Sequence, residues 1–332
     1  MKKIKIAQIG TSNNGHGTLI WKSIVKQSDL FEVVGYTFPE DEWEKFPSHQ
    51  KYFEGHRALT LEQVLNDPEI EAVSVEGEEI YLTKYALMAA KAGKHVHMEK
   101  PGGVELADFE ALIAAMKQTG KVFSTGYMYR FNPKIMEAME KIRSGELGEI
   151  YAVEAHMDCL HKPELKNWLS AFPGGMLFYL GCHLIDLIYA IQGEPTKVIP
   201  LSRSTGFDGV RAEDYGMAVF EYQRGVSFAK TSACEPGGYL RRQLVICGEK
   251  GTVEIKPLEV SMGGSIVYTV SNESTAESWH EPWSTSQTEP FDRYDAMMKN
   301  FAEMVRGKEN PYPYDYELNL YKLILRACGK EV

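Results

Sequence analysis

Two side chains have the chemistry and the surroundings for proton transfer on a hydroxyl group. Lys100 follows the apolar run Lys94–Met98, and His183 lies within the helical pattern Met176–Ile191. An ammonium at the carboxyl end of a parallel strand faces the crevice where α/β sheets bind ligands. An imidazole, with an unperturbed pKa of about 6.5, can accept a hydroxyl proton. Both side chains are therefore candidates for acid–base roles, although the residues alone favour a surface turn for Lys100 and a core position for His183.

Tyr179 stands four residues before His183, so one continuous helix would put both side chains on the same face. The phenol could orient the imidazole or bond a substrate hydroxyl itself. Tyr179 therefore joins the predicted catalytic residues, whereas Asp186 is interpreted as structural.

A glycine-containing loop follows the first apolar run and precedes a helical pattern. It approximates the spacing G-x-G-x-x-G, with Ser12 at the middle glycine. In such loops the first glycine permits a tight turn, and the helix N-terminus offers N–H groups to a pyrophosphate. The strand before and the helix after favour phosphate binding over a turn without a ligand. The predicted phosphate-binding residues are Gly10, Thr11, Ser12, Asn13, Asn14 and Gly15.

The carboxylate that holds an adenosine ribose is expected about 20 residues beyond the glycines. Phe38 stands near that position, and Glu40 or Asp41 could replace the acid from the following loop. No arginine is nearby to meet a 2′-phosphate. The pattern therefore favours NAD over NADP and places Phe38 in the cofactor site.

Several side chains after the predicted sixth strand and in the second half could contact a substrate. Aromatic faces suit the C–H surfaces of sugars, although packing at a hinge would use the same residues. The candidates are Tyr127, Tyr129, Arg130, His161 and Trp168. The segment His156–His161 holds possible metal ligands without a zinc-like spacing, so we predict no metal site.

The elements that must position these residues fall into two patterns. Up to residue 125, short strands alternate with helices, which is typical of a doubly wound parallel sheet. Thr60 and Gln63 are expected to form a capping box at the start of a helix, and Gly120 is expected to end one. The expected strands are Ile4–Ile9, Phe31–Thr37, Arg57–Leu59, Glu71–Val75, Lys94–Met98 and Val122–Thr125. Residues 126–332 contain mostly alternating strands, Val226–Ser232 among them, with segregated helices. This pattern indicates an α+β domain on a largely antiparallel sheet.

Composition excludes several classes of protein. The chain has 332 residues and a net charge of −10, without a cluster of Lys or Arg, so no nucleic-acid partner is expected. No apolar run reaches the ~18–20 residues of a membrane helix, so no membrane partner is expected either. The five cysteines include no C-x-x-C pair, which fits a reduced, cytoplasmic location.

Motifs spread over nearly the whole chain resemble the Gfo/Idh/MocA oxidoreductases, the family of glucose–fructose oxidoreductase and inositol dehydrogenase. The markers are Ala92-Gly93-Lys94-His95-Val96, Glu99-Lys100-Pro101, Gly126 with Arg130-Phe131-Asn132-Pro133, Ser144–Ile150, and Gly174-Gly175 through Gly181–Asp186. The resemblance implies a Rossmann domain joined to an open-faced sheet domain and NAD(P)-dependent chemistry on sugars or cyclitols. It also implies a cis Lys100–Pro101 peptide, and homodimers or homotetramers formed through the sheet.

The chain departs from the family pattern at two places. Tyr179 replaces an Asp that commonly precedes the helix histidine by four residues, and Gly77–Leu82 replaces a T-P-N-x-x-H segment. By the resemblance, Lys100 and His183 take the acid–base roles, and Gly77 and Glu99 join Lys100 in lining the cofactor. The leading hypothesis is hydride transfer between a nicotinamide and a hydroxyl carbon of a sugar, cyclitol or sugar acid. Alternatives are a redox-neutral epimerase or glycoside-cleaving enzyme that retains NAD, and a non-catalytic sugar-binding protein.

Overall fold

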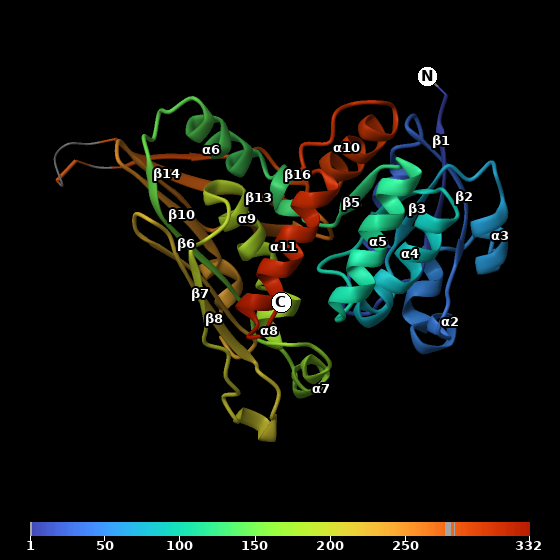
Figure 1. Ribbon diagram of the computed structural model, residues 1–332, viewed down its shortest axis with the longest axis horizontal. Coiled ribbons are helices and arrows are strands. Elements are labelled where there is room, and N and C mark those ends of the chain that lie inside the picture. Colours follow the sequence, from blue (N-terminus) through green and yellow to red (C-terminus); the bar gives the residue numbers. More distant parts are fainter. Residues whose placement is uncertain (1, 276–279, 282) are drawn as a thin grey trace. The chain divides into compact units, whose positions relative to one another are not determined.

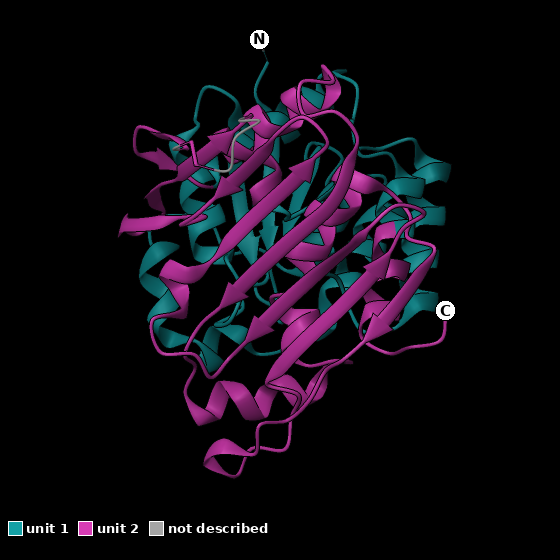
Figure 2. Cartoon of the chain, turned by 90° about the vertical axis from the view of Figure 1, so that its left-hand side faces the viewer, with its two compact units in different colours: residues 1–128, 294–319 teal, residues 129–293, 320–332 magenta. Residues whose placement is uncertain are grey.

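The computed structural model describes residues 2–275, 280–281 and 283–332. These residues form two compact units, coloured teal and magenta in Figure 2. Unit 1 comprises the chain up to Met128 together with Tyr294–Asn319, and unit 2 comprises Tyr129–Arg293 together with Leu320–Val332.

Unit 1 is built on a five-stranded parallel sheet with the order β2-β1-β3-β4-β5 (Figure 1). Its strands are β1 (Ile4–Ile9), β2 (Phe31–Thr37), β3 (Ala72–Val75), β4 (His95–Met98) and β5 (Phe123–Thr125). The chain turns to opposite sides of β1 to make β2 and β3, so the order reverses there. In doubly wound sheets this reversal leaves a ligand-binding crevice at the carboxyl ends of the strands.

The helices of unit 1 begin and end where the sequence supplies caps and glycines. Thr60 and Gln63 form the predicted capping box, because Thr60 Oγ1 accepts from Gln63 N at 3.1 Å and Gln63 Oε1 accepts from Thr60 N at 2.9 Å. Gly120 ends α5 in the left-handed conformation, as predicted for a terminal glycine. The helices are α1 (Gly17–Lys26), α2 (Glu42–Lys45), α3 (Leu61–Asn66), α4 (Leu82–Lys91), α5 (Leu106–Thr119) and α10 (Asp295–Val305).

Two features of unit 1 differ from expectation. The expected strand Arg57–Leu59 is only an isolated bridge between Ala58 and Tyr36, because Thr60 already caps α3. Helix α10, which the division at residue 126 assigned to the second domain, packs on α1. There Asp295 accepts hydrogen bonds from Ser23 Oγ and Lys26 Nζ at 2.8 and 2.5 Å.

Unit 2 contains an eight-stranded sheet with the order β15-β14-β11-β10-β6-β9-β8-β7. Only its β6–β9 pair is parallel among the described strands. The strands are β6 (Ile150–Asp158), β7 (Lys197–Pro200), β8 (Tyr215–Glu221), β9 (Val226–Ser232), β10 (Gln243–Gly248), β11 (Thr252–Ile255), β14 (Val270–Ser274) and β15 (Ser284–Gln287). A smaller sheet joins β12 (Val260–Gly263), β13 (Ile266–Tyr268) and β16 (Phe291–Asp292).

The helices of unit 2 cover one face of the large sheet (Figure 1). They are α6 (Pro133–Arg143), α7 (Pro163–Trp168), α8 (Met176–Tyr179) and α9 (Cys182–Gln192), and α11 (Tyr314–Ala327) begins in unit 1 and ends in unit 2. Ala218 and Ala229 are fully buried, whereas their neighbours Val219 and Phe228 are half-buried. This alternation confirms a sheet with one packed face and one open face, as expected. Within the described ranges, no helix has the length and apolar content needed to cross a membrane.

Candidate functional site

The glycine loop follows β1 and leads into α1, at the strand-order reversal of unit 1. Gly10 has a positive φ of 85°, and a Cβ atom there would lie 2.4 Å from Gly77 Cα. Only glycine therefore fits both the turn and the close approach of the β3–α4 connection. Ser12 donates its backbone N–H to Glu76 O at 2.8 Å, while the side chain of Asn13 is exposed.

A carboxylate from α2, which the sequence pattern did not single out, lies against this loop. Glu42 accepts hydrogen bonds from Thr11 N and Glu78 N, both at 2.8 Å, and is 1% exposed. Burial raises the pKa of Glu42 to about 7, against the lowering effect of the two backbone donors. Glu40 and Asp41 both adopt left-handed conformations, with φ of 59° and 58°. These two left-handed residues direct the chain inward at Glu42. The acidic run Glu40–Glu42 was the only sequence signal for a carboxylate at this place.

The other residues expected near the ribose have other contacts. Phe38 packs against Tyr36, Trp43 and Phe53, with ring centroids 4.7–5.6 Å apart. Glu40 Oε1 accepts from Lys84 Nζ at 2.5 Å and from Tyr85 Oη at 2.6 Å. The structure therefore gathers Gly10, Thr11 and Gly77 around Glu42, and it places Phe38 in an aromatic cluster.

Two further carboxyl groups lie at the same edge of the sheet: Glu79, in the segment that replaces T-P-N-x-x-H, and Glu76, just before it. Glu79 Oε2 accepts from Ser12 Oγ at 2.9 Å, and burial raises the pKa of Glu79 to about 7. Glu76 is fully buried and accepts from Ser74 Oγ at 2.6 Å. Burial and the neighbouring Glu99 hold the pKa of Glu76 well above its ordinary value.

The Glu99-Lys100-Pro101 segment follows β4 at this edge. Lys100 is 1% exposed, its Nζ lies 3.9 Å from Glu99 Oε1, and the Lys100–Pro101 peptide is cis. Both oxygens of Glu99 lie 3.2 Å from His16 Nδ1. Burial raises the pKa of Glu99, but the imidazole of His16 and the ammonium of Lys100 outweigh burial and lower it. Glu99 therefore acts as an ion-pairing carboxylate.

In unit 2, the prediction of one continuous helix over Met176–Ile191 was wrong. The helix breaks at Leu180 and Gly181, between α8 and α9. A Cβ on Gly181 would lie 2.6 Å from Leu177 O, so the chain packs too closely there for a larger residue. Tyr179 consequently ends α8, and its ring lies edge-on to Trp168 at 5.2 Å. His183 lies in the first turn of the separate helix α9.

His183 is 1% exposed and packs against a buried polar network. Its ring lies edge-on to that of Tyr129, with centroids 5.1 Å apart. Tyr129 Oη donates to Glu259 Oε1 at 2.7 Å, and Arg242 Nη1 lies 2.9 Å from the same oxygen. Glu259 therefore fixes the aromatic ring that supports the imidazole, a role that its sequence position did not reveal.

Arg130 and Asp186 form a buried, forked ion pair in unit 2. Arg130 Nε and Nη2 donate to Asp186 Oδ1 at 2.9 and 2.7 Å. This pair gives Asp186 the structural role that was expected of it. Tyr127, the other aromatic residue after β5, is 2% exposed and belongs to unit 1.

His161 lies beside a thiol. Its Nε2 is 2.9 Å from Cys159 Sγ, and its backbone N–H donates to Ala233 O at 2.8 Å. Burial and the nearby Arg242 lower the pKa of His161, and burial raises the pKa of Cys159 to about 11. At neutral pH the thiol is therefore protonated and unreactive.

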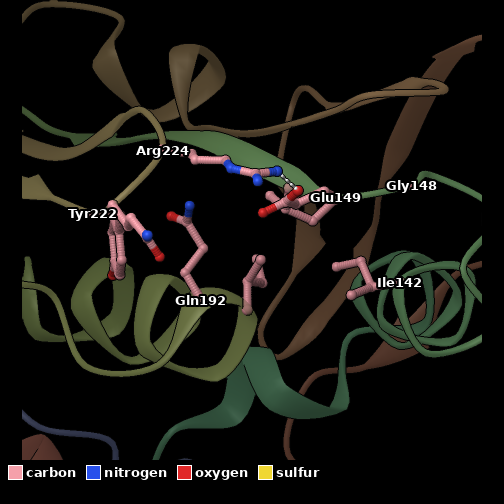
Figure 3. A pocket seen from close by; sticks show the side chains of 9 residues that line it. Ile142, Gly148, Glu149, Gln192, Tyr222 and Arg224 are labelled. Atoms are coloured by element: carbon pink, nitrogen blue, oxygen red, sulfur yellow. Dashed lines mark hydrogen bonds and ion pairs between the residues drawn. The ribbon is translucent and has the colours of Figure 1, made fainter.

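A pocket of about 360 Å³ lies at the other end of α9 (Figure 3). It is lined by Ile142, Gly148, Glu149, Ile150, Ile191, Gln192, Tyr222, Gln223 and Arg224. Gln192 ends α9, about nine residues or 13 Å along the helix from His183. Arg224 and Glu149 form an exposed ion pair beside it. The pocket contains none of the predicted site residues.

Comparison with family models settles the membership. Residues 4–127 match the oxidoreductase family with an NAD-binding Rossmann fold, and residues 135–254 match the GFO/IDH/MocA C-terminal domain. The chain belongs to the Gfo/Idh/MocA oxidoreductase family.

Named relatives of this family member include two bacterial proteins. An uncharacterized oxidoreductase, YhhX of Escherichia coli, is 34% identical over 143 residues, which cover 43% of this chain and 41% of that protein. A 1,5-anhydro-D-fructose reductase of Ensifer adhaerens is 28% identical over 52% of this chain and 53% of the reductase. The matched regions thus span about half of these relatives or less.

The fold is also seen in the aldose-aldose oxidoreductase of Caulobacter crescentus, solved with glycerol. That structure superposes with a TM-score of 0.80 at 22% identity, over 99% of this chain and 98% of that chain.

The residues of unit 1 fit an NAD(P) cofactor. The loop Gly10–Gly15 lies at the strand-order reversal, where parallel sheets bind dinucleotides. The carboxylate of Glu42 adjoins its first glycine, and carboxylates are the groups that accept from ribose hydroxyls. Both features agree with the family's NAD-binding fold.

Proposed function

We propose that this family member is an NAD-dependent oxidoreductase that transfers hydride between the nicotinamide and a hydroxyl-bearing carbon of a sugar, cyclitol or sugar acid. The supporting observation is that the carboxyl ends of adjacent strands β1, β3 and β4 bring together the glycine loop, Glu79 and Lys100. The loop would hold the phosphates, with contacts from Gly77 and Glu99, while Lys100 would act on the substrate.

The protein groups would divide the proton chemistry as follows. When bound, NAD would supply the acceptor for hydride. The ammonium of Lys100 would donate a hydrogen bond to the reacting hydroxyl and stabilise the negative charge that develops on its oxygen. His183 would take the hydroxyl proton, held in place by the ring of Tyr129. Tyr179, which replaces the family's Asp, would bond a substrate hydroxyl.

The side chains of unit 2 support a hydroxyl-rich substrate. Trp168 and Tyr179 form an aromatic pair of the kind that packs on sugar C–H groups. Arg130 forms an ion pair with the buried carboxylate of Asp186, and Arg242 forms one with that of Glu259. In this proposal Tyr127, Tyr129 and His161 complete the substrate contacts. The names of the sugar-related relatives point in the same direction.

We expect Glu42 to determine the preference for NAD. Glu42→Gln should weaken NAD binding about tenfold or more, because a buried charged acceptor of hydrogen bonds is worth ~1.5–3 kcal/mol. The same change should reduce the preference for NAD over NADP, because it removes a negative charge that would repel the 2′-phosphate of NADP. Fluorescence titration with NADH and NADPH measures both effects. Glu44→Gln, an exposed change on the same helix, is the control. Unchanged affinities in Glu42→Gln would contradict this assignment.

Two further parts of the proposal concern assembly and location. The open face of the sheet carries half-buried Val219, Phe228 and Val245 on three of its strands. This face supports a homodimer or homotetramer, which light scattering at micromolar concentration would reveal.

No disulfide links any of the five cysteines, which supports a reduced cytoplasmic location.

The function is tested with purified protein, NAD and a panel of sugars, cyclitols and sugar acids. Production of NADH that requires one of these compounds is the expected result. Turnover of a sugar without net NADH would instead favour the redox-neutral reaction. Failure to bind NAD or NADH would reject both enzymatic proposals.

A further inference from the structure

The carboxyl group of Glu79 lies directly against the glycine loop. Its Oε2 accepts from Ser12 Oγ at 2.9 Å, and a Cβ atom on Gly15 would lie 3.5 Å from its Oε1. Glu79 therefore adjoins the stretch Ser12–Gly15, whose backbone is assigned to phosphate binding in the proposed function. Within the described part of the chain, its Oε1 is buried and accepts no hydrogen bond.

The groups that face Glu79 come from three elements. From the end of β4, the ammonium of Lys100 lowers the pKa of Glu79 and the carboxylate of Glu99 raises it. From the loop, the hydroxyl of Ser12 lowers it, and His16 faces Glu99 rather than Glu79. From the end of β3 comes Glu76, whose own pKa lies well above its ordinary value. Burial has the largest influence and raises the pKa of Glu79 to about 7.

We propose that Glu79 is a proton-linked residue of the cofactor site: it takes up one proton when a dinucleotide's pyrophosphate binds to the loop and releases it when the dinucleotide leaves. The inference rests on the proposed function. A buried carboxylate repels a neighbouring phosphate, because no bulk water screens the two charges. Protonation removes this repulsion and gives the carboxyl an O–H donor. Binding is therefore expected to favour the neutral form of Glu79.

Glu42 also has a pKa of about 7, but it is expected to exchange its proton in the opposite direction when NAD binds. As a ribose acceptor it must be ionised, so its contribution is release of a proton on binding. The contribution of Glu79 is therefore measured as a difference between the wild type and Glu79→Gln. Glutamine keeps the size of the side chain and an oxygen for Ser12 Oγ, but it does not titrate.

The experiment is calorimetric titration of the protein with NAD between about pH 6 and pH 9, in two buffers of different ionisation heat. From the linkage relation, the wild type should take up about one more proton per NAD bound than Glu79→Gln near pH 8. As pH rises above about 7, the ratio of the wild-type Kd to that of Glu79→Gln should grow by up to about tenfold per pH unit. Glu62→Gln, exposed on α3, should match the wild type.

Several outcomes would overturn the inference. Equal proton uptake and parallel pH profiles in wild type and Glu79→Gln would do so while leaving NAD binding intact. If Glu79→Gln does not fold, Ser12→Ala replaces it: loss of the hydroxyl donor should move the midpoint of the wild-type pH dependence upward, and an unmoved midpoint rejects the role of Glu79. Absence of NAD binding at every pH would reject the proposed function and this inference together.

Discussion

Replacing Lys100 by methionine is expected to lower kcat on the active substrate by about 10²–10⁴-fold while leaving the Kd for NAD within about threefold. Methionine fills a similar apolar volume at this buried position but has no ammonium to stabilise charge on the reacting oxygen. Steady-state kinetics gives kcat, and fluorescence titration gives the NAD affinity. Lys91→Met, at the exposed end of α4, is the matched control and should keep full activity.

Measuring kcat and the NAD affinity separately distinguishes a catalytic effect of the substitution from a purely structural one. Loss of Lys100 also removes the positive charge facing Glu79 and Glu99. If the effect of the substitution were purely structural, NAD affinity and thermal stability would fall together with kcat. Turnover within about threefold of the wild type would refute proton chemistry at Lys100.

Replacing Arg130 by methionine is expected to destabilise unit 2 by about 3–5 kcal/mol, because it removes the guanidinium that pairs with the buried carboxylate of Asp186. Arg130 is 7% exposed and Asp186 is fully buried, and two guanidinium nitrogens bind one carboxyl. Urea unfolding followed by tryptophan fluorescence measures the change. The double variant Arg130→Met with Asp186→Leu should recover most of the lost stability, because no charge is then left behind.

A surface pair provides the comparison for this effect. Arg143 and Glu140 are three residues apart on α6 and both largely exposed, so Arg143→Met should cost no more than about 0.5 kcal/mol. A loss below about 1 kcal/mol in Arg130→Met would show that the buried pair contributes little. It would then favour the alternative expectation that Arg130 serves the substrate.

Local sequence signals predicted much of the fold because they act over a few residues. Apolar runs bounded by polar turns placed β1, β2 and β9 with their observed bounds. The Thr60 and Gln63 box and the terminal glycine at 120 were predicted because capping depends on neighbours in sequence. The family motifs extended this local information to the order of the two units.

Features that depend on close packing, on unusual backbone conformations or on distant contacts were not predictable from these signals. The break at Gly181 arises where the chain packs against Leu177 too closely for a side chain, within an otherwise apolar helical pattern. Glu42 reaches the glycine loop because two successive non-glycine residues adopt left-handed conformations. Glu259 lies far in sequence from Tyr129, yet it holds that side chain. The sequence thus indicated the loop, Lys100, Glu99 and His183 as candidates, but not the other carboxyl groups around them.

The return of α10 to unit 1 has a consequence for the order in which the molecule can fold during synthesis. Helix α1 finds its partner Asp295 only after residues 129–293 have left the ribosome. Domains generally fold as they emerge from the ribosome. The N-terminal sheet therefore remains without α10 on α1 while the eight-stranded sheet of unit 2 is synthesised. A fragment that stops at residue 128 would leave the α10-facing side of α1 uncovered, so the coenzyme-binding half of this chain is not a separable module.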